Sequence, residues 1–446
     1  MCSSDLIRLA SETHHNRVGT DNSNDANNAS ERNVVAGGTA SIDISTAHDN
    51  VIAGNYVGLT ADGVSGLSSN FGILVAAGSK RNRIGTDGIG PANERERNVI
   101  GSDTAFGRIY VGDAGTDDTV IAGNYIGLNA AGTSSAAYSN KGVVIANGAK
   151  RTVIGTEGDG VNDSDQRNVI TSNGTGLLVT GVGTTDTVIA GNYIGVQPDG
   201  LTGYGNTITL EVSGGAQKTR IGTDGSNDAF NVNERNLLCS GGFGVLLSQT
   251  SDVVIAGNYI GVAANGTKVL QHNTYGIRVS NQVTGLRIGT DGNGVADSVE
   301  GNVISGNQSG LQLYNWDMMD LATADKLLSG AILSTTATAT IPQADLTIAA
   351  GGVAGNWGNN HLLPGRGGAY FAFRATGVLK VSTAGDYTLA MSADRGGRLL
   401  IDGVARIVDD GNHGGMLTSR ATVNRSEEHT SEFQSHLNLV CRLLLE

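Results

Sequence analysis

The eight-residue string VIAGNYIG recurs along this chain at a nearly constant interval. It begins at Val120, Val188 and Val254, and the near-identical VIAGNYVG begins at Val51. From each start to the next, the chain advances by 69, 68 and 66 residues. A repeat of this length indicates a solenoid, because each repeat can bury its apolar face only against its neighbours.

Three further motifs interleave with the first and divide each repeat into two halves. The motif RIGTDG and its variants begin at Arg17, Arg83, Val153, Arg220 and Arg287. The motif RNVI and its variants follow at Arg32, Arg97, Arg167, Arg235 and Gly301. A run such as GILV precedes each half, for example at Gly72, Gly142, Gly176, Gly244 and Gly276. Each half therefore holds three short runs dominated by β-branched residues, which predicts strands and not helices.

The two halves differ at their corners. VIAGN turns tightly on Gly-Asn, whereas RIGTD is followed by about ten acidic, Asn-rich residues. Matching the two motifs predicts that Asn192 lies at the same corner as Asp224. The corner asparagines, from Asn55 to Asn258, are expected to adopt left-handed torsions and to bond the backbone of adjacent coils.

The alternation of side chains along each strand assigns the isoleucines of both motifs to the interior. Each isoleucine is expected to stack on its equivalent one coil away, at a distance of about 4.8 Å. The predicted buried set is Ile52, Ile84, Ile121, Ile154, Ile189, Ile221, Ile255 and Ile288. The repetition of VIAGNYIG is thus explained first by its role in building the fold and not by a catalytic or binding role.

This ordered set of motifs resembles the right-handed parallel β-helix of the pectate-lyase-like superfamily, and within it bacterial surface proteins with GNYIG and NVISGN coils. The resemblance spans about Ile7 to Tyr314. It implies an all-β fold, a solenoid of about eight or nine coils over residues 7–316. It leaves activity open, because the superfamily includes lyases, hydrolases, adhesins and phage tailspikes.

The tyrosines of the repeated motif follow the Gly-Asn corner and are predicted to point outward, since the next residue points inward. They would form a surface ladder on which sugar rings can stack. The alternative is that each tyrosine packs under its own adjacent loop. The predicted carbohydrate-binding ladder is Tyr56, Tyr125, Tyr193 and Tyr259.

The acidic loops after the RIGTDG motifs place Asp and Asn oxygens among glycines, a composition that suits Ca²⁺. The best candidate set for a metal is Asp291, Asn293 and Asp297. None of the loops has the spacing of an EF-hand, and Asp and Asn are also ordinary turn residues. No cofactor is therefore certain, and Ca²⁺ is the only candidate.

The sequence pattern of the chain changes after the last repeat. Runs such as GDYTLAMSAD and GRLLIDG alternate apolar and polar residues, which indicates antiparallel strands. Residues 317–424 resemble a truncated protective-antigen fourteen-kilodalton (PA-fourteen) domain, a β-sandwich common in secreted glycan-binding and glycan-processing proteins. The resemblance makes Asp394 a candidate carbohydrate-binding and Ca²⁺-binding residue. Sugar-binding members carry a second Asp where this chain has Arg395, whose charge opposes a cation.

Both ends of the chain lack the repeat pattern. Residues 1–6 and 425–446 resemble translated sequencing adapter, and we exclude them from the fold. Two of the three cysteines lie in these ends, so only Cys239 remains. A lone cysteine in a strand-like run is expected to be a small core residue.

The net charge and the motifs restrict the classes of function that the chain can have. The net charge of −13 disfavours nucleic acid as a partner, and no apolar run is long enough to span a membrane. We expect a fragment of a larger, multidomain bacterial protein that is secreted or on the cell surface. It would serve as an adhesin-like stalk or glycan-interacting scaffold, with an extracellular or cell-surface polysaccharide as partner.

The alternative function is a carbohydrate-active enzyme, a polysaccharide lyase or glycoside hydrolase. Such a site needs acids and a base gathered on one face of the strands. Arg108, Asp113 and Arg278 are instead scattered along the sequence. A non-catalytic role is therefore favoured, and no catalytic residue is assigned.

Overall fold

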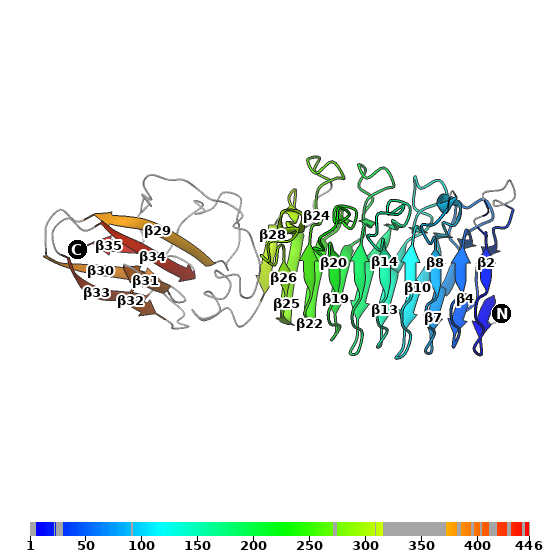
Figure 1. Ribbon diagram of the computed structural model, residues 1–446, viewed down its shortest axis with the longest axis horizontal. Coiled ribbons are helices and arrows are strands. Elements are labelled where there is room, and N and C mark those ends of the chain that lie inside the picture. Colours follow the sequence, from blue (N-terminus) through cyan, green and yellow to red (C-terminus); the bar gives the residue numbers. More distant parts are fainter. Residues whose placement is uncertain are drawn as a thin grey trace. The chain divides into compact units, whose positions relative to one another are not determined.

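The computed structural model describes residues 6–307 except 22, 24–29, 91 and 271–273, and beyond them only strands between residues 309 and 445. The chain divides into two compact units, Met1–Gln312 and Leu313–Glu446. The first unit is a parallel β-helix, in which strands of successive coils lie side by side from β2 to β26 (Figure 1).

Three parallel sheets form the β-helix. The long-strand sheet contains β1 (Ile7–Ala10), β4 (Ala40–Ser45), β7 (Ser68–Ala76), β10 (Asp103–Gly112), β13 (Ser139–Ala146), β16 (Asn173–Thr180), β19 (Ile208–Ser213), β22 (Phe243–Ser251), β25 (Tyr275–Thr284) and β28 (Ser309–Tyr314). The motif sheet, formed by the VIA and RIG runs, contains β2 (Arg17–Gly19), β5 (Val51–Ala53), β8 (Arg83–Gly85), β11 (Val120–Ala122), β14 (Val153–Gly155), β17 (Val188–Ala190), β20 (Arg220–Gly222), β23 (Val254–Ala256) and β26 (Arg287–Ile288).

The tyrosine sheet carries the YI and VI runs. It contains β3 (Val34–Val35), β6 (Tyr56–Val57), β9 (Val99–Ile100), β12 (Tyr125–Ile126), β15 (Val169–Ile170), β18 (Tyr193–Ile194), β21 (Leu237–Leu238), β24 (Tyr259–Ile260) and β27 (Val303–Ile304). Among the described residues, helix is confined to single turns in the loops, η1 (Asn93–Arg95) and α1 (Asp297–Glu300). None of the helices in the described part of the chain is long and apolar enough to cross a membrane.

The core of the β-helix consists of stacked isoleucines, as the sequence predicts. Ile189 of β17 lies opposite Ile154 on one side and Ile221 on the other, and all three are fully buried. The remaining members of the predicted set are also buried, with Ile288 the most accessible at 4%. Cys239 is likewise a buried core residue whose thiol donates to the Val262 carbonyl, and burial raises its pKa to about 12.

A buried ladder of asparagines runs along the corner between the motif sheet and the tyrosine sheet. The side-chain amide of each asparagine donates to the side-chain oxygen of the next, over distances of 2.9–3.1 Å. The ladder comprises Asn33, Asn55, Asn98, Asn124, Asn168, Asn192, Asn236, Asn258 and Asn302. Buried side-chain amides therefore have partners in every coil that the ladder crosses.

This ladder corrects two details of the sequence analysis. Asn192 is aligned with Asn168 and Asn236 of the RN motifs and not with Asp224. The reason is that the acidic loop is inserted before the corner, so the asparagine after the loop takes the equivalent place. The left-handed torsion belongs to the preceding glycine, since Gly191 has a φ of 73°.

The second unit contains two antiparallel sheets, in agreement with the alternation in its sequence. One has the order β29 (Ala372–Lys380), β34 (Thr430–Asn438), β31 (Gly397–Ile401) and β32 (Val404–Asp409). The other has the order β33 (Leu417–Arg425), β30 (Gly385–Ala393) and β35 (Arg442–Leu445). Residues 425–446, which we excluded from the fold, thus contribute paired strands, while their adapter origin stays a prediction.

The isoleucine stack can be tested with a pair of neighbouring substitutions. Ile189→Asp places an unpaired carboxylate in the core and is expected to cost at least about 3 kcal/mol of the free energy of unfolding. Val188→Asp is the matched control, because Val188 is only half-buried, and it should cost less than about 1 kcal/mol. The measurement is the denaturant dependence of the far-ultraviolet circular dichroism, and equal losses for the two variants would contradict the assigned register.

Candidate functional site

The tyrosines of the repeated motif are half-buried and do not form a bare aromatic surface. The guanidinium of Arg167, on the preceding coil, lies 4.1 Å from the ring centroid of Tyr193. A Cβ added to Gly200, in the loop that follows Tyr193, would lie 3.0 Å from the ring. Tyr193 also packs against the cluster of Val196 and Leu237. This arrangement corresponds to the alternative in which each tyrosine packs under its own loop.

The same cation–π pair recurs at every copy of the motif. The distances from the arginine Cζ to the ring centroid are 4.2, 4.2, 4.1 and 4.1 Å for Arg32–Tyr56, Arg97–Tyr125, Arg167–Tyr193 and Arg235–Tyr259. Each arginine Nε also donates to the carbonyl of the corner glycine next to that tyrosine's asparagine. One face of each ring is therefore covered by an arginine, which leaves less aromatic surface for a sugar to stack on. Carbohydrate binding by these tyrosines stays a prediction.

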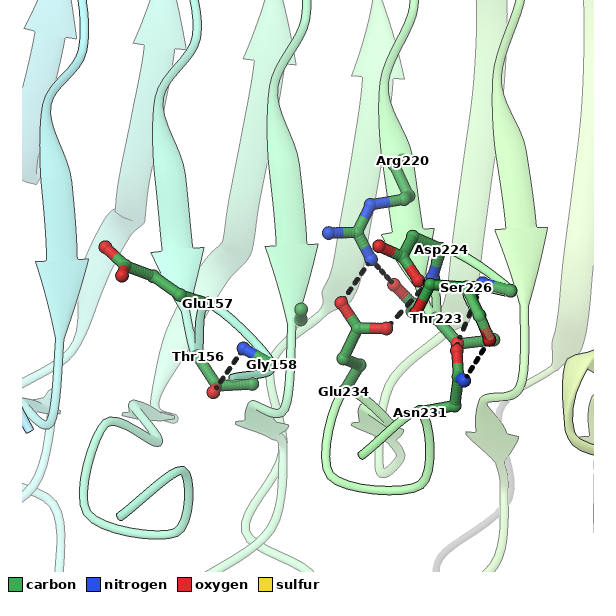
Figure 2. Close-up of polar contacts among 12 residues, drawn as sticks. Thr156, Glu157, Gly158, Arg220, Thr223, Asp224, Ser226, Asn231 and Glu234 are labelled. Carbon is green, nitrogen blue, oxygen red and sulfur yellow. Dashed lines mark hydrogen bonds and ion pairs between the residues drawn. The ribbon is translucent and has the colours of Figure 1, made fainter. Parts of the chain in front are cut away.

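Two of the acidic loops, those after Arg220 and Arg287, are closed by a clamp between an arginine and a glutamate. Arg220 Nη1 donates to Glu234 Oε1 at 2.6 Å, and the backbone N–H of Asp224 donates to Glu234 Oε2 at 2.9 Å (Figure 2). The side chain of Glu234 is 3% exposed. Its burial raises the pKa of the carboxyl, although Arg220 and the Asp224 N–H act in the opposite direction.

One loop shows that the clamp depends on charge balance. Val153 occupies the place of the arginine in that loop, and Gln166 occupies the place of the glutamate. The amide oxygen of Gln166 still accepts the N–H of Glu157, at 3.1 Å. The hydrogen bond that closes the loop is therefore kept, and the buried carboxylate is absent where its cation is absent.

Contacts between neighbouring loops extend the clamps into a continuous stack. Arg17 Nη1 lies 3.1 Å from Glu96 Oε1 of the next loop. The side-chain amide of Asn162 donates to the carbonyl of Gly88 at 2.8 Å, and that of Asn233 donates to Asp163 at 2.7 Å. The acidic residues of these loops thus serve first to hold the loops against one another.

The predicted metal set lies in the last of these loops. The structure brings ligand atoms of Asp291, Asp297 and Glu300 within 4.8 Å of one another, so Glu300 joins the set that the sequence suggested. Asn293 turns its amide nitrogen toward Asp291, at 3.0 Å. Glu300 pairs with the guanidinium of Arg287 at 2.8 Å.

These contacts bear on whether the loop suits a cation. Carboxylate oxygens are the ligands that Ca²⁺ prefers, but Arg287 already supplies the positive charge that Glu300 needs. Asp297 accepts hydrogen bonds from Thr290 and from the N–H of Gly294. In this arrangement the carboxylates are already paired with donors of the protein, and the metal assignment stays a prediction.

Aromatic side chains on the long-strand sheet were missed by the sequence analysis. Phe71 stacks on Phe106 with the ring centroids 5.0 Å apart, and Phe243 stacks on Tyr275 at 5.5 Å. Arg278 lies 5.3 Å from the ring centroid of Phe243. A signal was present, because the residue before the glycine is aromatic in FGILV, FGVLL and YGIRV.

The comparison with known families concerns the second unit. Residues 340–434 match the model of the PA14 domain, and this match extends past Arg425. No curated protein matches the chain. The chain thus combines a parallel β-helix with a PA14-like domain. Asp394, the candidate carbohydrate-binding residue of that domain, lies outside the described residues, as does Arg395.

The clamp can be tested by transplanting the neutral pair that the chain itself contains. Arg220→Val alone leaves Glu234 buried without its cation and is expected to cost about 3–5 kcal/mol. Glu234→Gln alone leaves Arg220 unpaired and should cost about 1–3 kcal/mol. The double variant reproduces Val153 with Gln166, so it should be more stable than Arg220→Val alone. Denaturant unfolding of all four proteins completes the cycle, and additive losses would contradict the clamp.

Proposed function

We propose that this chain is part of a secreted or cell-surface protein in which the β-helix is an adhesin-like stalk that presents glycan-interacting surfaces. The observation that carries the proposal is the regularity of the described coils. The same asparagine contact recurs from Asn33 to Asn302, and the same arginine–tyrosine pair recurs at each copy of the motif. A solenoid stabilised this way at every coil suits a rigid spacer.

The PA14-like domain supports interaction with glycans and an extracellular location. Residues 340–434 match a family that is common in secreted glycan-binding and glycan-processing proteins. Arg395 follows Asp394 where a second acidic ligand would hold Ca²⁺. We therefore expect glycan binding by this protein to be independent of Ca²⁺.

The second candidate function, a carbohydrate-active enzyme, would need an acid and a base that face one another on the strands. On the long-strand sheet, Glu211 and Arg278 flank Leu246 in register, so they lie two strands apart. That separation is about 9.6 Å between backbones. The guanidinium of Arg278 lies 5.3 Å from the ring centroid of Phe243, and the separation of the two strands favours the stalk over the enzyme.

The proposed function predicts chelator-resistant binding to an array of extracellular glycans. The full chain is applied with Ca²⁺ and then with EDTA, and equal binding is expected because Arg287 already pairs with Glu300 in the acidic loop and Arg395 stands where a second acidic ligand would be. Tyr193→Ala should weaken binding, and its thermal midpoint shows whether loss of packing against Arg167 accounts for the change. Binding that disappears in EDTA would instead assign the contact to a metal site. Absence of binding to every glycan would contradict a glycan-interacting role and leave only the stalk.

A further inference from the structure

A hollow of about 500 Å³ opens on the corner between the tyrosine sheet and the long-strand sheet. Two loops form its sides, the one after β12 and the one after β18, and Ser172 of the intervening coil also lines it. Its remaining lining residues are Ser135, Tyr138, Gly203, Tyr204 and Gly205. The volume is sufficient for one sugar ring, and the lining combines aromatic rings with hydroxyl groups.

The side chains of the hollow are arranged to contact a ring with polar substituents. Tyr138 is 60% exposed, so more of its ring is accessible for stacking than in the half-buried motif tyrosines. Tyr204 accepts the backbone N–H of Ser135 at 2.9 Å, which fixes its phenol and leaves the hydroxyl hydrogen free to donate. The Ser172 hydroxyl is buried behind the surface of the hollow and has no hydrogen-bond partner among the described residues.

A fully buried arginine lies directly behind the wall of this hollow. Arg108 Nη1 donates to the carbonyl of Ser172 at 3.2 Å and to the side chain of Asn173, and Nη2 donates to the carbonyl of Ala137 at 2.6 Å. Nε donates to the carbonyl of Ser102 at 3.0 Å. The guanidinium thus contacts backbone of both Ser172, which lines the hollow, and the residue next to Tyr138.

The charge of Arg108 has no carboxylate partner. No ion pair involves it in the described part of the chain, and Asp103, the acid that influences it electrostatically, is exposed. Burial lowers the pKa of Arg108 to about 9, which reflects the cost of holding this cation away from water. The oxygens of these carbonyl groups point toward the guanidinium, so the positive carbon end of each carbonyl dipole points away from it. An anion nearby in the hollow would therefore be attracted.

The repeat shows that the fold does not require an arginine at this position. Arg108 lies opposite Gly72 on one neighbouring strand and opposite Gly142 on the other. In those two coils glycine occupies the equivalent position, and the coil forms without an arginine. The single coil that replaces glycine with a buried cation is also a coil whose corner adjoins the hollow.

We propose that this hollow binds a saccharide ring that carries an anionic substituent, with Tyr138 as the stacking surface and Arg108 as a positioning residue that selects the negative charge through the wall. This inference rests on the proposed glycan interaction and specifies its site and its ligand class. The hydroxyl of Tyr204 supplies a hydrogen bond to the ring.

The test measures binding of two matched probes to the full chain, oligosaccharides of glucuronate and neutral oligosaccharides of glucose, by titration calorimetry. The unaltered protein should bind the acidic probe about fivefold or more tightly. Tyr138→Ala should weaken binding of both probes about three- to tenfold. Phe230→Ala, which removes an exposed aromatic ring from a different corner, is the matched control and should change neither.

A second pair of variants separates the charge from the fold. Arg108→Gln removes the charge and is expected to abolish the preference for the acidic probe, whereas Arg108→Lys should retain it. If Arg108→Gln does not fold, weakening of the preference in the unaltered protein as salt is raised provides the same test.

The outcomes distinguish this site from the broader function. Equal binding of both probes by the unaltered protein, or binding unaffected by Tyr138→Ala, would overturn the inference. If glycans on the array still bind when Tyr138→Ala has no effect, the proposed function stands and only this site fails. Absence of binding to any glycan would overturn both.

Discussion

The asparagine ladder is the contact on which the rest of the β-helix depends. Each interior member, such as Asn124, is fully buried, donates from its side chain to the next asparagine and to a carbonyl of the coil before it, and accepts from the previous asparagine. A buried chain of satisfied amides is strong because the low dielectric strengthens each bond, and costly to interrupt because an orphaned amide stays desolvated. The ladder fixes the spacing of the coils, and that spacing lets the isoleucines stack.

The corner before the motif sheet explains why the repeat is two coils long and not one. Its residues alternate in sign, and all have positive φ: Asp49, Arg81, Asp118, Arg151, Asp186, Lys218 and Asp252. Arg81 pairs with Asp49 at 2.7 Å, and Arg151 pairs with Asp118 at 2.6 Å. Each exposed pair contributes little energy, but a slip by one coil would place like charges together. The arginine–tyrosine pairs also require a repeat of two coils, because each pair places an arginine on one coil and a tyrosine on the next.

Features that follow from the periodicity of the repeat could be predicted from the sequence. Features that depend on the inserted loops or on contacts between coils could not. The isoleucine core was predictable because strand alternation leaves one choice of register. The partner of Asn192 was not, because the loop before Asn236 shifts the alignment of the two halves. The tyrosines were correctly placed after the corner, but the arginine that covers each ring comes from another coil, and a single motif does not reveal it. Glu300 was missed for the same reason, since the chain turn that brings it to Asp297 is a property of the folded loop.

A regular solenoid also changes where a binding site should be sought. Residues that recur from repeat to repeat, such as the motif tyrosines and the clamp glutamates, have a structural explanation in the contacts between coils. A residue that breaks the pattern is not required by the repeat, and a buried cation among such residues is retained at a cost. Arg108 is such a residue, because glycine occupies the equivalent position in both neighbouring strands and a buried cation needs compensation. Specific binding on this stalk is therefore expected where the repeat is interrupted, since a ligand supplies the compensation that the regular coil lacks.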